Sequence, residues 1–553
     1  MTTLNLPAAI VASYHSFKLY PQNLIYQTSY RGAAKAYGAR LDNAAPQLFT
    51  DEPDKILIPF RDLVDAPSGS QGILYLIDFI SNTDLKSVKG FVKQNILNDA
   101  ALKLWLGDHS DVDANGAITG PVATKLDPKC RFIGITSFLS AGNSRNPLKL
   151  SRTMLVRILT YHQVMPIYLD FISVFGSQIE PRDLRFSGFR EQCLISKPVR
   201  GPAVPALGRS GLQIQLCYNL KAANCIDSTA KHKQWSIRQA AFHHQFDIQE
   251  GTTLWIITKG DLSLKERIQD MTGPRGKPEE KKYDTVAECF KNTMLIHILY
   301  CHWATEDWRW YIQWLEEIIE RITSIALRAS RDRSKDRHTF KPEDVLNVQD
   351  YEDKTNEAIM ILEANMNVMT SLRKCYERLV EDKDFPSWKS TCREDVVAFT
   401  DQVNDMIYDS EMQISRAKLL VRIISDRKNL VREHLQTQAT EKMEDLTISN
   451  YKEAIAMRII TVVTLIYLPA TFVSTFFSTD VIKYQNQNDN SNASESSESQ
   501  QFKGSYSGIA LQRWFEVTIP LTLITLTLGY YFYRQASKKS KEDVLPFYSD
   551  SKS

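Results

Sequence analysis

The distribution of charge along the chain separates a long mixed region from two uncharged stretches near the C-terminal end. Residues 459–477 (IITVVTLIYLPATFVSTFF) and 517–533 (VTIPLTLITLTLGYYFY) contain no charged residue. A helix that crosses a bilayer needs about 20 mostly apolar residues. The first stretch has this length, and the second reaches it once Trp514 and Phe515 are included. The pattern predicts transmembrane helices over 457–479 and 514–533, with a pair of buried soluble helices as the alternative.

Short β-like runs alternate with helical stretches over residues 1–285, and Gly, Pro, Asn and Asp separate them. The pattern predicts strands at 55–60, 72–80, 130–136, 212–220 and 253–260. Such alternation indicates a soluble α/β (or α+β) domain. The charged segment 270–284 contains Gly and Pro and predicts the end of this domain.

The region from 286 to 456 has the pattern of long helices. One helix starts near Thr391, and no breaker follows before Pro469. Apolar or small residues recur in it every seven positions, which predicts a coiled-coil stalk. The two stripes are Val396, Val403, Ser410, Ala417, Ile424 and Val431, and Ile407, Ile414, Val421, Lys428 and Leu435, with one lysine as the exception. About 65 residues of helix before the membrane span roughly 100 Å. The spacing leaves open whether the stalk's partners lie in the same chain or in other subunits.

Basic residues flanking the two spans predict the orientation of the chain. The tail 534–553 carries Arg534, Lys538, Lys539 and Lys541, whereas the segment 480–513 between the spans has more acidic than basic residues. The positive-inside rule therefore predicts two passes, with both termini in the cytosol and the loop 480–513 outside. The stretch 485–508 is polar and low in complexity, so we expect it to be disordered. All eight cysteines precede the first span without a CxxC pair, which indicates reduced cytosolic thiols.

Composition and motifs exclude several classes of function. A net charge of +2 gives no argument for nucleic acid as a partner. The chain has no GxSxG, HExxH or GxGxxG motif, so we predict no enzyme, no catalytic residue and no cofactor. Two groups contain metal-binding residue types without the spacing of a zinc site, and we interpret them as structural, with metal binding as the alternative. They are His243-His244 with His232, and Cys301-His302 with Glu306-Asp307. His162 is interpreted as a core histidine rather than a catalytic base.

The first span and its approach, MRIITVVTLIYLPATFVSTFFSTDV (457–481), resemble the CorA family of magnesium and divalent-cation channels. In that family a proline and a threonine-bearing stretch precede an aromatic-Gly-Met-Asn signature. Pro469, Thr471 and Phe477 match, whereas Ser478, Thr479 and Asp480 replace Gly-Met-Asn. The region before the stalk is similar to a group of fungal proteins that end in a CorA-like region, through the stretches 148–171, 186–190, 208–220 and 306–316.

The resemblance implies a homopentamer in which the first spans line a pore for divalent cations such as Mg²⁺. Residues on one face of that helix would form the ion pathway, since oxygen groups can hold a hydrated ion. They are Met457, Thr461, Thr464, Leu468, Thr471, Thr475 and Ser478. Alternatively, the threonine and serine hydroxyls among these residues form hydrogen bonds with their own helix backbone or with a neighbouring helix. Asp480 and Thr479 occupy the place of the filter, and a ring of five Asp480 carboxylates would concentrate cations.

We therefore interpret the chain as a divalent-cation channel of the plasma membrane or an endomembrane, with the lipid bilayer and further copies of itself as partners. The missing Gly-Met-Asn motif keeps a second hypothesis open. In it, the chain is a non-conducting oligomeric sensor or scaffold with the same architecture.

Overall fold

The computed structural model describes most of the chain in two compact units, Met1–Arg432 and Glu433–Ser553. The described residues are 4–25, 31–50, 52–65, 89–112, 118–119, 124–135, 146–177, 185–195, 202–227, 234–329, 340–478 and 508–544. The predicted strand at 72–80 and the predicted disordered stretch lie outside these residues, except for Gly508. The domain limits predicted at 285 and 456 stay predictions.

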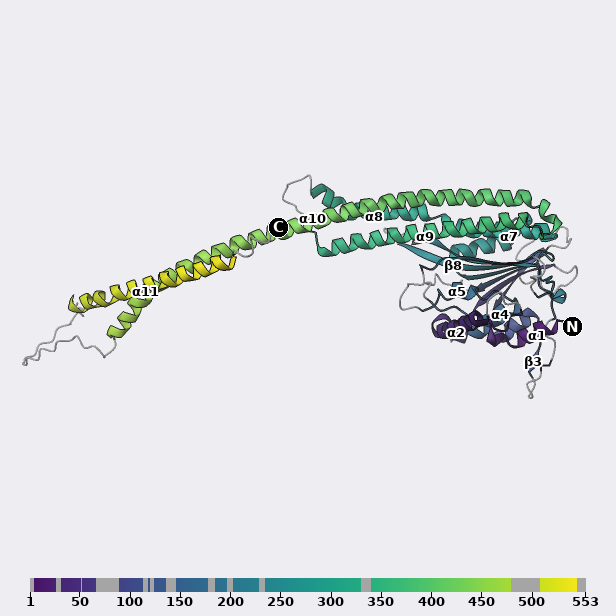
Figure 1. Cartoon of the computed structure of the whole chain (residues 1–553), viewed down its shortest axis with the longest axis horizontal. Helices are drawn as coiled ribbons and strands as arrows, with labels where there is room; N and C mark the ends of the chain where they lie inside the picture. The colour runs from purple at the N-terminus through teal and green to yellow at the C-terminus, as the bar shows by residue number, and fades with distance from the viewer. Residues whose placement is uncertain are drawn as a thin grey trace, which may run out of the picture. The chain divides into compact units, whose positions relative to one another are not determined.

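A mixed β-sheet forms the centre of the first unit (Figure 1). Among the described residues it has seven strands in the order β2-β1-β5-β9-β8-β7-β6, and β5 and β9 pair in parallel. The strands are β1 (Ile58–Asp65), β2 (Lys89–Ile96), β5 (Cys130–Ile135), β6 (Phe189–Leu194), β7 (Gln213–Asp227), β8 (Gln234–Asp247) and β9 (Thr253–Lys259). A separate short hairpin joins β3 (Asp111–Val112) to β4 (Ile118–Thr119).

Helices cover both faces of the sheet, which confirms the predicted mixed α/β class (Figure 1). One face packs on α1 (Ala8–His15), α2 (Arg31–Leu48), α3 (Asp99–Leu106), α4 (Arg152–Tyr161) and α5 (Tyr168–Ile172). The other packs on α6 (Leu262–Thr272), α7 (Val286–Thr305), α8 (Trp308–Ala329), α9 (Pro342–Glu381) and the first part of α10 (Arg393–Ser478). The short 3₁₀ turns are η1 (Phe17–Leu19), η2 (Pro53–Lys55), η5 (Pro205–Leu207), η6 (Pro278–Lys281) and η7 (Ser387–Ser390).

The central strand β9 shows why the sheet needs helices on both faces. All its residues are buried, and the apolar run 254–257 forms its centre, as expected for a strand covered on both sides. Trp255 stacks on His244 of β8, with ring centroids 3.9 Å apart, and on Phe132 of β5. Helix α7 begins with a capping box in which Thr285 and Glu288 satisfy each other's backbone N–H groups.

The predicted stalk stripe is buried inside a single chain. All six residues of the first stripe, from Val396 to Val431, are buried in the first unit. Arg416 forms a bidentate ion pair with Glu316 of α8, and Lys428, the charged exception in the second stripe, pairs with Glu352 of α9. The buried stripe of α10 up to residue 432 therefore packs on helices of the same chain.

The second unit contains the rest of α10 and α11 (Gly508–Val544). Both helices are long and apolar enough to cross a membrane, and α10 continues through Pro469 to Ser478. Most of their apolar side chains are exposed, including those of Ile460 and Leu523, unlike the side chains of a buried soluble pair. This agrees with the two predicted spans.

Candidate functional site

The predicted ion pathway lies on the face of α10 that points away from α11. The α10 residues covered in this unit are Leu465, Pro469, Ala470, Val473 and Phe477. Each residue turns the helix by about 100°, so the mean direction of these covered side chains around the helix axis can be compared with that of the predicted stripe. The two directions differ by roughly 170°. Every stripe residue is exposed in the single chain: Met457, Thr461, Thr464, Leu468, Thr471, Thr475 and Ser478. The structure therefore brings the predicted pathway residues together on one uncovered face.

Contacts between α10 and α11 leave this face open. Trp514 at the start of α11 donates its indole N–H to Ser474 Oγ at 3.0 Å. Gly529 of α11 also lies beside Leu465, since a Cβ on this glycine would be in van der Waals contact with Leu465 Cδ1 at 3.5 Å. Trp514 and Gly529 of α11 therefore contact α10 away from the predicted stripe.

The hydroxyls of the stripe donate to the backbone of their own helix. Thr461 Oγ1 donates to Met457 O at 2.7 Å, and Thr475 Oγ1 to Thr471 O at 3.0 Å. Hydrogen bonding of these hydroxyls to the helix backbone is the alternative that the sequence left open. It is compatible with a pore, because a hydroxyl oxygen that donates its hydrogen keeps its lone pairs for an ion or for the water around an ion. The predicted filter residues Thr479 and Asp480 lie outside the described residues.

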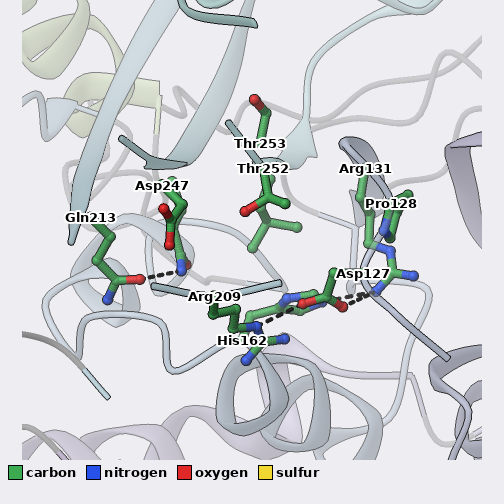
Figure 2. Close-up of a pocket in the computed structure, with 11 residues that line it drawn as sticks. Asp127, Pro128, Arg131, His162, Arg209, Gln213, Asp247, Thr252 and Thr253 are labelled. Atoms are coloured by element: carbon green, nitrogen blue, oxygen red, sulfur yellow. Dashed lines mark hydrogen bonds and ion pairs between the residues drawn. The ribbon is translucent and has the colours of Figure 1, made fainter. Parts of the chain in front are cut away.

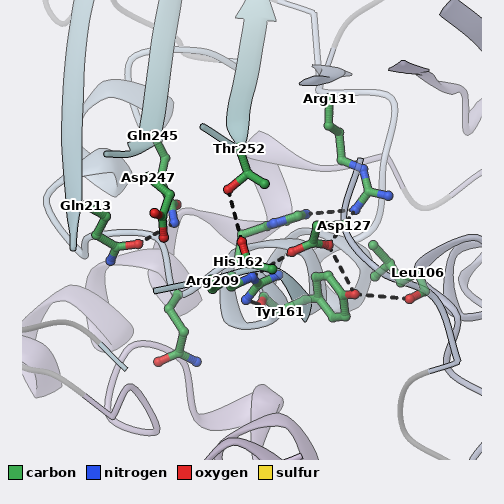
Figure 3. A network of polar contacts seen from close by, with 12 residues as sticks. Leu106, Asp127, Arg131, Tyr161, His162, Arg209, Gln213, Gln245, Asp247 and Thr252 are labelled. Atoms are coloured by element: carbon green, nitrogen blue, oxygen red, sulfur yellow. Dashed lines mark hydrogen bonds and ion pairs between the residues drawn. The ribbon is translucent and has the colours of Figure 1, made fainter. Parts of the chain in front are cut away.

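A second polar site lies in the first unit, at the end of the sheet where β5 and β9 begin (Figures 2 and 3). Asp62 of β1 and Arg131 of β5 are cross-strand partners, and the guanidinium donates to both carboxylate oxygens at 2.9 and 2.7 Å. The Asp127 carboxylate lies between two guanidinium groups, 3.6 Å from Arg131 Nη1 and 2.7 Å from Arg209 Nε. Arg209 also donates to the carbonyl oxygen of Tyr161 at 2.6 Å. Two buried cations are thus balanced by two carboxylates.

Electrostatics stabilise this pairing and keep the neighbouring histidine neutral. Burial alone would lower the pKa of Arg131, but the Asp62 and Asp127 carboxylates outweigh it and raise that pKa. Burial and the charges of Arg209 and Arg131 hold the pKa of His162 well below its ordinary value. His162 is therefore a buried neutral histidine, as the sequence predicted.

The cavity at this site is small, about 30 Å³, and its carboxylates are already occupied. Asp247 accepts from the backbone N–H and the hydroxyl of Ser210, both at 2.7 Å. Within the described residues, Arg209 Nη2, Gln245 Oε1 and Thr253 Oγ1 are buried without a hydrogen-bond partner. A cavity of this size with a few polar atoms suits ordered water. The hydrogen bonds and ion pairs of this site connect the loops at the end of the sheet to one another.

His243, His244 and Cys301 are buried in the core of the first unit. In the described part of the chain, no three His, Cys, Asp or Glu side chains are placed to hold a metal ion. Burial lowers the pKa of both His243 and His244 to about 3, so both are neutral core residues. His232 lies outside the described residues.

Comparisons with known proteins complete this picture. A family model of CorA-like transporters matches residues 12–327, a range that extends from within α1 to within α8 and contains the seven-stranded sheet. Among solved structures, the CorA magnesium transporter from Methanocaldococcus jannaschii is similar at 10% identity and a TM-score of 0.28, covering 77% of this chain and 96% of that one. The full-length CmaX protein is similar at 13% identity and a TM-score of 0.26, covering 58% and 74%. No curated protein matches the chain.

Proposed function

The chain belongs to the family of CorA-like transporters, and we propose that it forms an oligomeric channel for divalent cations of the magnesium class. The observation that carries the proposal is the uncovered stripe of hydroxyls on α10, opposite the face that packs on α11. The described residues of one chain contain two candidate spans, which are too few to enclose a pore. Several copies, five in our proposal, would bring their stripes together around a common axis.

The chemistry of the stripe suits a hydrated divalent ion. Magnesium loses its water reluctantly, so a pore that conducts it is expected to contact the hydration shell through uncharged oxygen atoms. Thr461, Thr464, Thr471, Thr475 and Ser478 supply such oxygens along successive turns of α10. Met457 would lie at the inner mouth, while Thr479 and Asp480 would form the outer filter. In our proposal both termini lie in the cytosol and residues 480–513 face the outside.

Uptake into vesicles reconstituted with the purified full chain tests this function. We expect uptake of at least one of magnesium, manganese, cobalt and nickel. Thr471→Leu, which puts an apolar side chain on the stripe, should lower uptake at least tenfold. Thr527→Leu is the matched control, because Thr527 is exposed on α11 and points away from the packed face.

Native mass spectrometry in detergent separates a blocked pore from a failed assembly. We expect the same oligomer for the unmodified chain and for both variants. An oligomer that takes up none of the four ions would favour the non-conducting scaffold, and a purely monomeric chain would refute the pore.

A further inference from the structure

A second cavity in the first unit, of about 70 Å³, lies between the sheet and α6. Three cationic side chains line it: Arg61 of β1, Lys93 of β2 and Lys265 of α6. Its apolar wall is formed by side chains that include Phe132 and Ile257 from the sheet and Ile268 from α6. The described residues that line the cavity include no carboxylate.

Strand pairing places two of these charges directly opposite each other. Arg61 and Lys93 are cross-strand partners in the antiparallel β1–β2 pair. Like charges in this arrangement destabilise a sheet. The next residue of β1 is arranged differently. Asp62 points to the other face of the sheet, where its carboxylate neutralises the cross-strand Arg131. The same strand thus balances the charge on one face and concentrates positive charge on the other.

The cavity also holds these groups in a partly buried setting. Burial, together with the charges of Arg61 and Lys265, lowers the pKa of Lys93, so both cations lie close enough to Lys93 to disfavour its charged form. Arg61 Nη1 donates to Thr272 Oγ1 at 3.1 Å, which fixes the guanidinium at the cavity. The repulsion between Arg61 and Lys93 costs folding free energy that an anion in the cavity would recover.

We propose that this cavity binds a small organic phosphate, with its phosphate group among Arg61, Lys93 and Lys265 and its apolar part against Phe132, Ile257 and Ile268. An arginine fork and ammonium groups are the usual protein ligands of phosphate oxygens. A water needs about 10–15 Å³ by the same measure, so about 70 Å³ has room for a group of several heavy atoms. A few polar groups beside an apolar wall are typical of small-molecule sites.

Calorimetric titration of the purified full chain, with phenyl phosphate and inorganic phosphate as probes in chloride-matched buffer, tests the proposal. We expect both to bind, and phenyl phosphate at least tenfold more tightly, because its ring can contact the apolar wall. Lys93→Gln and Lys265→Gln should each weaken phenyl phosphate binding at least tenfold. Lys18→Gln is the matched control, since Lys18 is exposed on η1 outside the cavity and its variant should bind like the unmodified chain.

A stability measurement without ligand distinguishes a binding site from a structural one. Lys93→Gln removes the repulsion with Arg61, so it should raise the urea midpoint of the ligand-free chain while it weakens binding. Binding of neither probe, or equal binding to the unmodified chain, Lys93→Gln and Lys265→Gln, overturns the site. Equal affinity for the two probes overturns the assignment of the apolar wall. These outcomes are independent of ion uptake, because the cavity lies in the first unit.

Discussion

Replacing Asp62 by Asn tests whether the buried ion pair with Arg131 stabilises the first unit. The side chains of Asp62 and Arg131 are only 8% and 7% exposed, and the substitution leaves the guanidinium buried without its bidentate partner. Removing one member of a buried pair costs about 3–5 kcal/mol. Asp127 remains 3.6 Å from Arg131 and compensates in part, so we expect about 3 kcal/mol, the lower end of that range.

Urea unfolding of the purified chain, followed by tryptophan fluorescence, measures this loss. The matched control is Asp350→Asn, which breaks the exposed pair between Asp350 and Lys354 on α9 and should cost less than about 0.5 kcal/mol. The double replacement Asp62→Leu with Arg131→Met should recover part of the loss, because it removes both buried charges. If Asp62→Asn costs no more than Asp350→Asn, the ion pair does not stabilise the unit and the reasoning is wrong.

Three further predictions concern pH, the outer mouth and topology. The pKa of His244 is about 3 when folded and about 6.5 when unfolded, so its contribution to stability is complete above about pH 6.5 and is lost as the pH falls. His244→Phe keeps an aromatic ring against Trp255 but has no titrating group. Below pH 6 this variant should reduce the slope of unfolding free energy against pH by about 1.4 kcal/mol per pH unit. If that slope is the same as in the unmodified chain, His244 is not a neutral histidine in the folded state. Asp480→Asn should lower divalent uptake at low ion concentration and Asp480→Lys should nearly abolish it, whereas unchanged uptake in both would remove Asp480 from the filter. An epitope added to the tail 534–553 should be protected from protease on intact cells, and cleavage from outside would reverse the proposed orientation.

Features that depend on local pattern could be predicted from the sequence. Uncharged runs predicted the two candidate spans, and seven-residue spacing predicted the buried stripe of α10, because helix periodicity and apolar content are properties of neighbouring residues. β5 and β9 were predicted over their whole length for the same reason, since each contains a short run rich in apolar residues. The predicted strand 55–60 overlaps β1 only from Ile58 onward, because a 3₁₀ turn precedes it.

Strands with a mixed pattern were missed. β2 and β6 contain charged residues, and the first half of β8 has polar residues at alternating positions, so none of them has the apolar run that predicts a buried strand. Their neighbours in the sheet stabilise them instead: β8 lies between β7 and β9, and the pairing of β7 with β8 extends over most of both strands. Tertiary pairing overrides weak local preference in such strands.

By itself, the sequence determined the class of fold, the candidate membrane spans and the stripe of hydroxyls, since each follows from the period of a helix or strand. Only the tertiary structure decided which charges meet. Asp62 and Arg131 are far apart in the chain, and so are Lys93 and Lys265, and no local spacing relates them. Strand register placed Asp62 opposite the cation Arg131, which balances its charge, and Arg61 opposite a second cation, Lys93. The physical reason is that the register of the whole sheet is chosen by burial of its apolar faces, and the positions of the charges follow from that register.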